Sequence, residues 1–161
     1  MIIGLKKTAV LCILRHRNQF LLLQRAKEPH KDEYIPIGGK IEQFEDPLSA
    51  TVWEVFEEIG LKLNRNDIQF IGMLSETSST KFNWINFVYY AEIDFFESSS
   101  YVEGNLHWIN KNDISLIPMP KTDLFFFRYL EENKPFMLNA TYDENLNLKS
   151  LTEEITKKEL I

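Results

Sequence analysis

The segment between residues 46 and 60 constrains this chain more than any other, because it combines clear helix boundaries with an unusual run of acids. Asp46 followed by Pro47 is a typical helix start, with a capping carboxylate and a proline in the first turn, and Gly60 is a typical helix end. On a helical wheel one stripe is apolar: Leu48, Val52, Val55, Phe56 and Ile59. The sequence therefore predicts an amphipathic helix over residues 47–59 whose apolar stripe packs on a core.

Three glutamates, Glu54, Glu57 and Glu58, lie on the opposite side of this helix. Carboxylates at spacings of three and four residues repel one another by roughly 0.2–0.5 kcal/mol per pair. No lysine or arginine lies between Ile41 and Gly60 to relieve that repulsion. One explanation is a solvated acidic face; the other is a site for a hard divalent cation such as Mg²⁺, which prefers several oxygen ligands.

The loop that precedes the helix favours the second explanation. Gly38 and Gly39 are followed by Lys40, and a further carboxylate, Glu45, ends the loop. Adjacent glycines allow the backbone to approach a phosphate or a metal closely. The combination of glycines, lysine and acidic helix predicts a site for a polyphosphate and a metal ion.

The amino-acid composition limits the number of domains, the kinds of partner and the cellular compartment. The chain has 161 residues, 44% of them hydrophobic, which suits one globular domain over residues 1–161, and its formal charge of −6 argues against binding a nucleic-acid polymer. The single cysteine, Cys12, can form neither an internal disulfide nor a zinc cluster, as in a reducing compartment. No apolar run is long enough for a membrane span. We expect a cytoplasmic protein without a membrane partner, as a monomer or a homodimer.

Periodicity and turn residues predict an α+β fold around a mixed central sheet. A hairpin is expected over residues 8–14 and 20–24, and a second helix over residues 124–132. Further expected elements are strands at 34–37, 68–74, 85–93 and 106–109, a helical turn capped by Asn110, a final hairpin at 143–145 and a charged tail at 152–161.

Residues 39–61 resemble the Nudix box, whose pattern is G-x5-E-x7-R-E-U-x-E-E-x-G-U, where U is a bulky aliphatic residue. Eight of the nine specified positions match: Gly39, Glu45, Glu54, Val55, Glu57, Glu58, Gly60 and Leu61. The resemblance implies an α/β/α sandwich over about residues 6–140, followed by a C-terminal hairpin and a charged tail at 141–161.

The resemblance also implies a chemistry. Nudix enzymes hydrolyse a diphosphate linked to another moiety, with Mg²⁺ or Mn²⁺. The metal ligands expected from it are Glu54, Glu57, Glu58 and the carbonyl of Gly38, with Glu103 as a candidate fourth carboxylate. The catalytic residues expected are Glu57, which orients or deprotonates the water, together with Glu54 and Lys40, which steadies charge on the leaving phosphate. Lys40 and Glu103 also suit the simpler role of ordinary loop residues.

One position departs from the pattern, because Trp53 stands where the family has arginine. In the family that arginine pairs with the first glutamate, here Glu45, and holds the loop against the helix. A tryptophan offers one neutral N–H and cannot make a bidentate bond to a carboxylate. We therefore expect Glu45 to turn to solvent or to accept from another donor, such as a backbone N–H at the start of the helix that Asp46 caps.

The C-terminal half resembles purine nucleoside triphosphate pyrophosphohydrolases, a branch that includes 8-oxo-dGTP diphosphatases. Asp123 stands where members of that branch contact the base, although a helix-cap role for Thr122 or Asp123 fits equally well. Trp84 suits stacking on a base or packing in the core. Ile35 replaces an asparagine that relatives of the vertebrate type use to bind the base, which favours broad or altered specificity.

Three functions follow for a nucleotide-binding protein of this kind. The first is a metal-dependent nucleoside triphosphate pyrophosphohydrolase. The second is a hydrolase of another nucleoside diphosphate derivative, such as ADP-ribose or a dinucleoside polyphosphate. The third is a weakly active or inactive ligand-sensing module, which Trp53 suggests and the three retained glutamates oppose.

Overall fold

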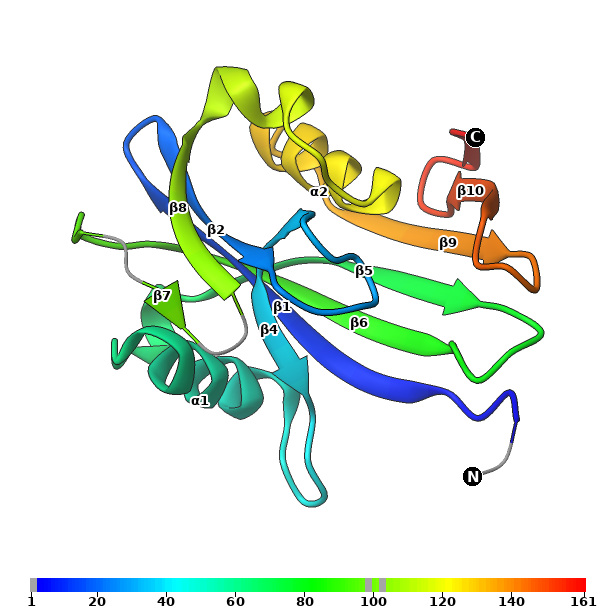
Figure 1. The fold of residues 1–161 in the computed structure, drawn as a ribbon, viewed down its shortest axis with the longest axis horizontal. Coiled ribbons are helices and arrows are strands. Elements are labelled where there is room, and N and C mark those ends of the chain that lie inside the picture. Colours follow the sequence, from blue (N-terminus) through cyan, green and yellow to red (C-terminus); the bar gives the residue numbers. More distant parts are fainter. Residues whose placement is uncertain (1–2, 98–99, 102–103) are drawn as a thin grey trace.

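Strand β1 (Lys7–His16) lies at the centre of a mixed sheet in the computed structural model, which describes residues 3–97, 100–101 and 104–161. The sheet order is β11-β10-β9-β5-β6-β1-β2-β8-β7, with β3 paired to β2 and β4 paired to β1 (Figure 1). The other strands are β2 (Gln19–Arg25), β3 (Tyr34–Ile35), β4 (Ile37–Lys40), β5 (Gln69–Thr77), β6 (Trp84–Glu92), β7 (Ser100–Tyr101), β8 (Gly104–Asn110), β9 (Phe136–Tyr142), β10 (Leu148–Glu153) and β11 (Lys158–Glu159).

Strand β1 changes its partner along its length, and this change positions the site. One edge of β1 runs parallel to β6 throughout. Along the other edge, Ala9–Cys12 pair antiparallel with β4, whereas Leu14–His16 pair antiparallel with β2. The chain passes from β3 to β4 through Pro36, which cannot donate a ladder hydrogen bond. As a result, the glycine-containing strand β4 lies beside the first half of β1.

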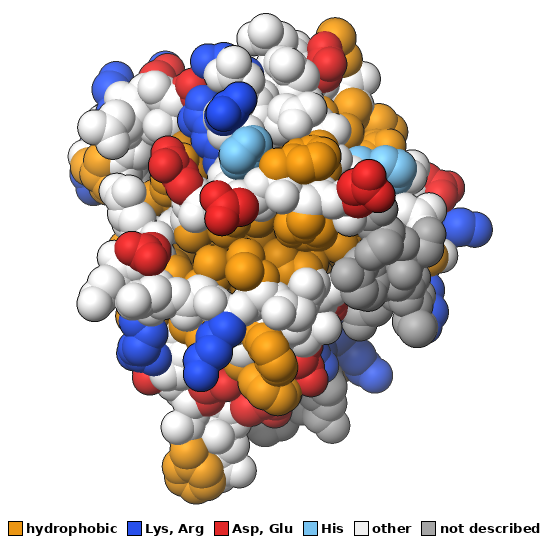
Figure 2. All heavy atoms as spheres, turned by 90° about the vertical axis from the view of Figure 1, so that its left-hand side faces the viewer, with side chains coloured by type: hydrophobic (Ala, Val, Ile, Leu, Met, Phe, Trp, Pro, Cys, Tyr) orange, Lys and Arg blue, Asp and Glu red, His pale blue; other side chains and the backbone are white. Residues whose placement is uncertain are grey.

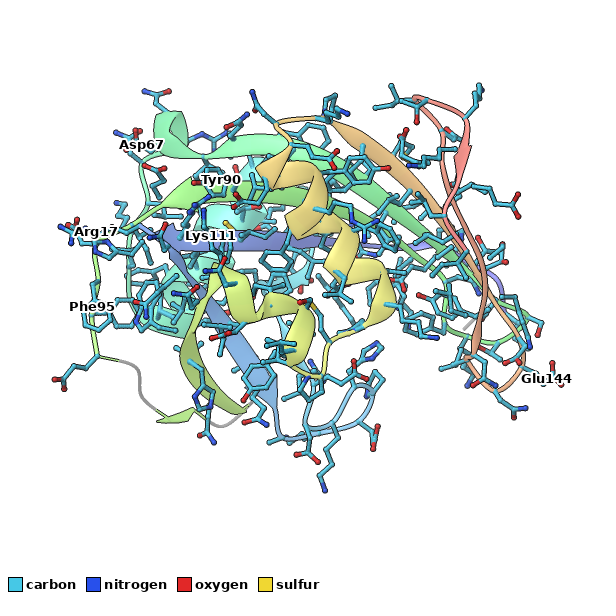
Figure 3. The ribbon with its side chains drawn as sticks, turned by 90° about the horizontal axis from the view of Figure 1, so that it is seen from above. Arg17, Asp67, Tyr90, Phe95, Lys111 and Glu144 are labelled. Atoms are coloured by element: carbon cyan, nitrogen blue, oxygen red, sulfur yellow. The ribbon has the colours of Figure 1, made fainter. Side chains whose placement is uncertain are left out.

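The two α-helices cover opposite faces of the sheet. Val10, Cys12 and Leu14 of β1 belong to the core beneath helix α1 (Pro47–Ile59), whereas Ile13 belongs to the core beneath helix α2 (Lys121–Glu131). Side chains of a strand alternate between faces, so one strand contributes to both cores. Figure 1 and Figure 3 show the two helices on either side of the sheet, which confirms the expected α+β sandwich with a mixed sheet.

Helix α1 begins and ends where the sequence predicts, but its buried face differs. Asp46 Oδ1 accepts a hydrogen bond from Ser49 N at 2.8 Å, and Gly60 ends the helix with φ +72°. The fully buried helix residues are Ala50, Thr51 and Val55, whereas Phe56 is 45% exposed, so the predicted place of Phe56 in the core is wrong. The small residues allow the helix backbone to lie close to the sheet, which turns the larger aromatic side chain outward.

The other elements lie within a few residues of their expected places. Helix α2 begins at Lys121, three residues before the predicted start, and Asn110 caps the 3₁₀ helix Lys111–Leu116 as expected. Seen from above, α2 crosses the sheet, with Arg17 and Phe95 at one end of the molecule and Glu144 at the other (Figure 3).

The outer surface of the molecule is mixed in character. The side at the left of Figure 1 has a hydrophobic band across its middle, bordered above and below by acidic and basic side chains (Figure 2). None of the helices in the described part of the chain has the length and apolar character needed to cross a membrane.

The C-terminal segment differs from the charged tail that its composition predicts. Residues 148–153 form β10 on the edge of β9, and the chain then turns back as β11. Glu153 in this segment is only 1% exposed, and its carboxylate accepts from the backbone N–H groups of Met137, Ile155 and Thr156 and from the Thr156 hydroxyl, at 2.7–3.0 Å. Burial alone raises the pKa of Glu153, but these donors outweigh it and lower the pKa to about 2. The tail is therefore held by a buried carboxylate.

Replacing this carboxylate should destabilise the fold. We expect Glu153→Gln to lower the free energy of unfolding by roughly 2 kcal/mol at pH 7, because an amide cannot accept all four hydrogen bonds. The folded pKa lies below the ordinary value of 4.5, so the stabilisation is complete above about pH 4.5 and is lost as the pH falls toward 2.

Urea unfolding at pH 7 and pH 3 measures the effect, with Glu154→Gln as a control that removes an exposed neighbouring charge. The gap between the Glu153 variant and the wild type should narrow at pH 3. Equal stability of the two variants at pH 7 would contradict the structural role of Glu153.

Candidate active site

The acidic side of α1 rests against the glycines of β4. A Cβ atom added to Gly39 would lie 2.3 Å from Cδ of Glu54, so only glycine leaves room for this carboxylate. Glu54 and Glu58 are half-buried and Glu57 is exposed on the same helix. The structure thus brings Gly39 and Glu54, two residues that the sequence placed in one candidate site, into close contact.

The donor set around this contact suits a hard divalent cation, which favours several carboxylate and carbonyl oxygens. Glu54, Glu57 and Glu58 offer carboxylates, and the adjacent glycine, Gly38, pairs with Leu11 of β1. In the described residues, no three acidic, histidine or cysteine side chains converge on one point. The predicted ligand Glu103 lies outside the described residues.

The carboxylate of Glu45 accepts a hydrogen bond from a donor other than the family's arginine. Its Oε1 accepts from the backbone N–H of Glu42 at 3.0 Å, within the same loop. Trp53 is 50% exposed, and its ring lies 6.1 Å from the ring of Phe56 on the outer side of the helix. The backbone donor that was expected for Glu45 is therefore present, although it comes from the loop rather than from the start of the helix.

A cavity of about 340 Å³ adjoins the other side of β4. Its wall includes three residues predicted from the sequence to serve the reaction or the substrate, namely Lys40, Trp84 and Asp123. Ile35 also lines the cavity, at the position where some relatives place asparagine. The rest of the wall is mostly apolar: Ala9, Val10, Leu11, Pro29, Pro36, Leu74, Phe82 and Pro120 together with Gly38 and Gly39, while Arg25, His30, Glu76, Asn86 and Thr122 supply polar groups.

Trp84 lies in the cavity wall rather than in the core. The side chain is half-buried at the start of β6, and Lys7 Nζ lies 5.2 Å from its ring centroid. A cation over an indole ring makes a favourable contact that restrains the ring. Trp84 is therefore a restrained aromatic surface at the cavity wall.

Asp123 does not cap α2. The N-cap position is Pro120, which makes no side-chain capping bond, so the helix-cap alternative for Thr122 or Asp123 is wrong. Asp123 is 6% exposed, and its Oδ1 accepts from Thr122 Oγ1 at 3.0 Å. Burial, together with the negative charge of Glu76, raises the pKa of Asp123 to about 8. At neutral pH this side chain is therefore a neutral carboxylic acid at the cavity wall.

Sequence reasoning missed a second carboxyl group in the same cavity. Glu76 near the end of β5 is 9% exposed and accepts from Asn86 Nδ2 at 2.9 Å and from Tyr142 Oη at 2.6 Å. Burial raises the pKa of Glu76, and these two donors oppose the shift. The available signal was Asn86, a polar residue within the otherwise apolar stretch Ile85–Val88.

Comparison with known proteins assigns the chain to a family of phosphoanhydride hydrolases. The model of the NUDIX domain family matches residues 5–139, so the chain belongs to this family, whose enzymes act on phosphorus anhydrides. The chain is 27% identical over 115 residues to the uncharacterized Nudix hydrolase YvcI of Bacillus subtilis, covering 70% of this chain and 71% of that protein.

Two solved structures show the same fold. The MutT protein of Bacillus halodurans has a TM-score of 0.80 at 23% identity, with 92% of this chain and 98% of that chain covered. A bifunctional NMN adenylyltransferase/ADP ribose pyrophosphatase of Francisella tularensis, complexed with AMP and a manganese ion, has a TM-score of 0.61 at 19% identity. In that comparison 82% of this chain and 43% of the other are covered.

Gly39 gives a direct test of the metal site. Gly39→Ala should push the Glu54 carboxylate away and weaken Mn²⁺ binding by about 10- to 100-fold, the range typical when ligand orientation is lost. Mn²⁺ binding can be measured by electron paramagnetic resonance without any substrate.

The matched control is Gly60→Ala, where no atom lies within 4 Å of the added Cβ but φ is +72°. This control should lower stability by about 1 kcal/mol and leave Mn²⁺ affinity unchanged. Equal Mn²⁺ affinities in the two alanine variants would exclude Gly39 and Glu54 from the metal site.

Proposed function

We propose that this NUDIX hydrolase is a metal-dependent nucleoside triphosphate pyrophosphohydrolase that acts on purine nucleotides, modified purines included, and releases nucleoside monophosphate and pyrophosphate. The observation that carries the proposal is the position of β4. One side of this strand receives Glu54 at Gly39, and the same glycines and Lys40 line the 340 Å³ cavity that contains Asp123 and Trp84. A nucleotide with its phosphates along β4 would place its base in this cavity.

The residues have distinct tasks in this proposal. Mg²⁺ or Mn²⁺, when bound, supplies charge neutralisation of the phosphates and a more acidic water. Glu54, Glu57, Glu58 and the Gly38 carbonyl would hold the ion. Glu57, the exposed member, takes the proton of the attacking water, and Lys40 offsets the charge on the leaving phosphate.

The base end of the cavity has its own features. Trp84 offers an aromatic surface for stacking, and the neutral Asp123 carboxyl offers a hydrogen-bond donor or acceptor to the base edge. Ile35 supplies apolar contact where some relatives hydrogen-bond the base. Recognition therefore depends on the Asp123 end of the cavity.

A second candidate is hydrolysis of ADP-ribose or a related nucleoside diphosphate derivative. The solved ADP ribose pyrophosphatase from Francisella tularensis shares the fold. In this chain the exposed Lys40 at the cavity wall suits a phosphate chain that continues past the helix. The products separate the two functions, because the first yields a nucleoside monophosphate and pyrophosphate, whereas ADP-ribose yields two monophosphates and a dinucleoside polyphosphate yields two nucleotides without pyrophosphate.

The deciding experiment is a hydrolysis panel of nucleoside triphosphates, ADP-ribose and dinucleoside polyphosphates, with and without Mg²⁺, in which the products are identified. Glu57→Gln and Glu58→Gln should each lower kcat by about 100-fold or more. Glu144→Gln, which removes a carboxylate at the far turn seen in Figure 3, should leave kcat unchanged. Full turnover in both glutamine variants of the helix would overturn the assignment, and pyrophosphate-free products would favour the second candidate.

We expect Trp53 to limit the turnover rate, kcat, and to have little effect on the KM for the substrate. Because Glu45 accepts from the Glu42 N–H in place of an arginine, we expect Trp53→Arg to add a charged partner for the loop and to raise kcat by about tenfold while KM changes little. Steady-state kinetics at saturating Mg²⁺ compare the two proteins. A slower variant would show that the indole itself supports the loop, and activity that appears only in the arginine variant would favour a ligand-sensing role for the wild type.

A further inference from the structure

A buried polar cluster at the base end of the cavity comes from three separate strands and α2. Glu76 of β5, Asn86 of β6 and Asp123 of α2 line the cavity, and Tyr142 at the end of β9 donates to Glu76. Glu76, Asn86 and Asp123 are each no more than 9% exposed. Such groups remain buried only when their hydrogen-bonding needs are met by the protein or by a ligand.

Two oxygens of this cluster have no hydrogen-bond partner among the residues that the structure describes. Within the described residues, Asp123 Oδ1 accepts from Thr122, but no hydrogen bond involves Asp123 Oδ2. Asn86 Nδ2 donates hydrogen bonds to Glu76 Oε1 and to the Leu74 carbonyl oxygen. Asn86 Oδ1 has no hydrogen-bond partner among the described residues. Neither oxygen is among the fully buried unpartnered atoms of the described residues, and both residues line the cavity.

Glu76 determines whether each of these two oxygens acts as a hydrogen-bond donor or as an acceptor toward the cavity. A carboxylate can only accept, so Glu76 Oε1 holds the Asn86 amide with its Nδ2 inward and its oxygen toward the cavity. Glu76 has two donors, from Asn86 and Tyr142, whereas Asp123 has one, from Thr122. When two neighbouring carboxyl groups share one proton, the proton resides on the group with fewer donors, which here is Asp123.

We propose, on the basis of the function proposed above, that Glu76 is a positioning residue of the substrate cavity, which fixes Asn86 Oδ1 as an acceptor and Asp123 Oδ2 as a donor toward the ligand. The ligand edge that fits this pair carries a hydrogen-bond acceptor beside an N–H group. Tyr142, through its hydroxyl, holds Glu76 in the charged, accepting state. Neither Glu76 nor Tyr142 needs to touch the ligand to set this pattern.

The charged surroundings support this division of roles. The positive groups act on Glu76 rather than on Asp123, since Lys6 and His30 lower the pKa of Glu76 while Glu76 and Glu33 raise that of Asp123. Lys6 Nζ also donates to the backbone carbonyl oxygen of Glu76 at 2.6 Å. The remaining cationic groups of the cavity wall are Arg25 and Lys40.

The test is a carbon-detected NMR titration of the Asp123 carboxyl, which needs neither metal nor turnover. In the wild type the inflection should lie near pH 8, and in Glu76→Gln it should fall by about one pH unit or more, because the neighbouring negative charge is gone. Tyr142→Phe should lower it in the same direction, since Glu76 then competes better for the proton. Glu92→Gln, which removes an exposed charge on β6, is the control and should leave the inflection in place.

A second measurement tests the part of the proposal that concerns contact between the ligand and the side chains of Asp123 and Asn86. GMP or AMP, added without metal at pH 7, should shift the Asp123 carboxyl and Asn86 side-chain signals of the wild type, and the affinity should fall about tenfold in Glu76→Gln. An unchanged Asp123 inflection in both Glu76→Gln and Tyr142→Phe would overturn the proposal. The proposal would also be overturned if neither GMP nor AMP shifted the Asp123 and Asn86 signals. Failure of the hydrolysis panel with these NMR results intact would instead refute only the proposed reaction.

Discussion

The close approach of α1 to β4 is the contact on which the rest of the site depends. At Gly39 the strand has no side chain, and the Glu54 carboxylate occupies the space that a Cβ would fill. This contact places an acidic helix on one side of a two-glycine strand and leaves the other side open to the cavity. Small residues on the helix, Ala50 and Thr51, complete the approach, because both are fully buried against the sheet.

Local signals predicted the parts of the structure that local chemistry determines. Helix α1 has the expected bounds because Asp46, Pro47 and Gly60 act within one turn of its ends. Its buried face was predicted less well, since a helical wheel counts Phe56 as core without knowing how near the sheet lies. The family resemblance added the fold and an expected metal-binding role for Glu54, which periodicity alone leaves between a metal site and a solvated surface.

The parts that were missed depend on pairing between distant strands. Glu76 and Asn86 meet because β5 and β6 are neighbours, and Tyr142 joins them from 66 residues further along the chain. Glu153 depends only partly on distant pairing, because Met137 donates from 16 residues earlier whereas Ile155 and Thr156 follow it closely, and backbone N–H donors leave no residue type that marks Glu153 as buried. Charged residues that are satisfied by backbone donors look like surface residues in a sequence.

The position of Tyr142 has an evolutionary consequence. The family model matches residues 5–139, which include the acidic helix and the glycine strand, whereas Tyr142 lies beyond that range and still bonds to a cavity residue. The acidic helix, β4 and the cavity residues Glu76, Asn86 and Asp123 thus lie inside the matched range, whereas the last residue of β9, which donates to Glu76, lies outside it. Substitutions at Tyr142 during evolution would alter the hydrogen bonding of Glu76 in the cavity and leave the acidic helix and β4 unchanged.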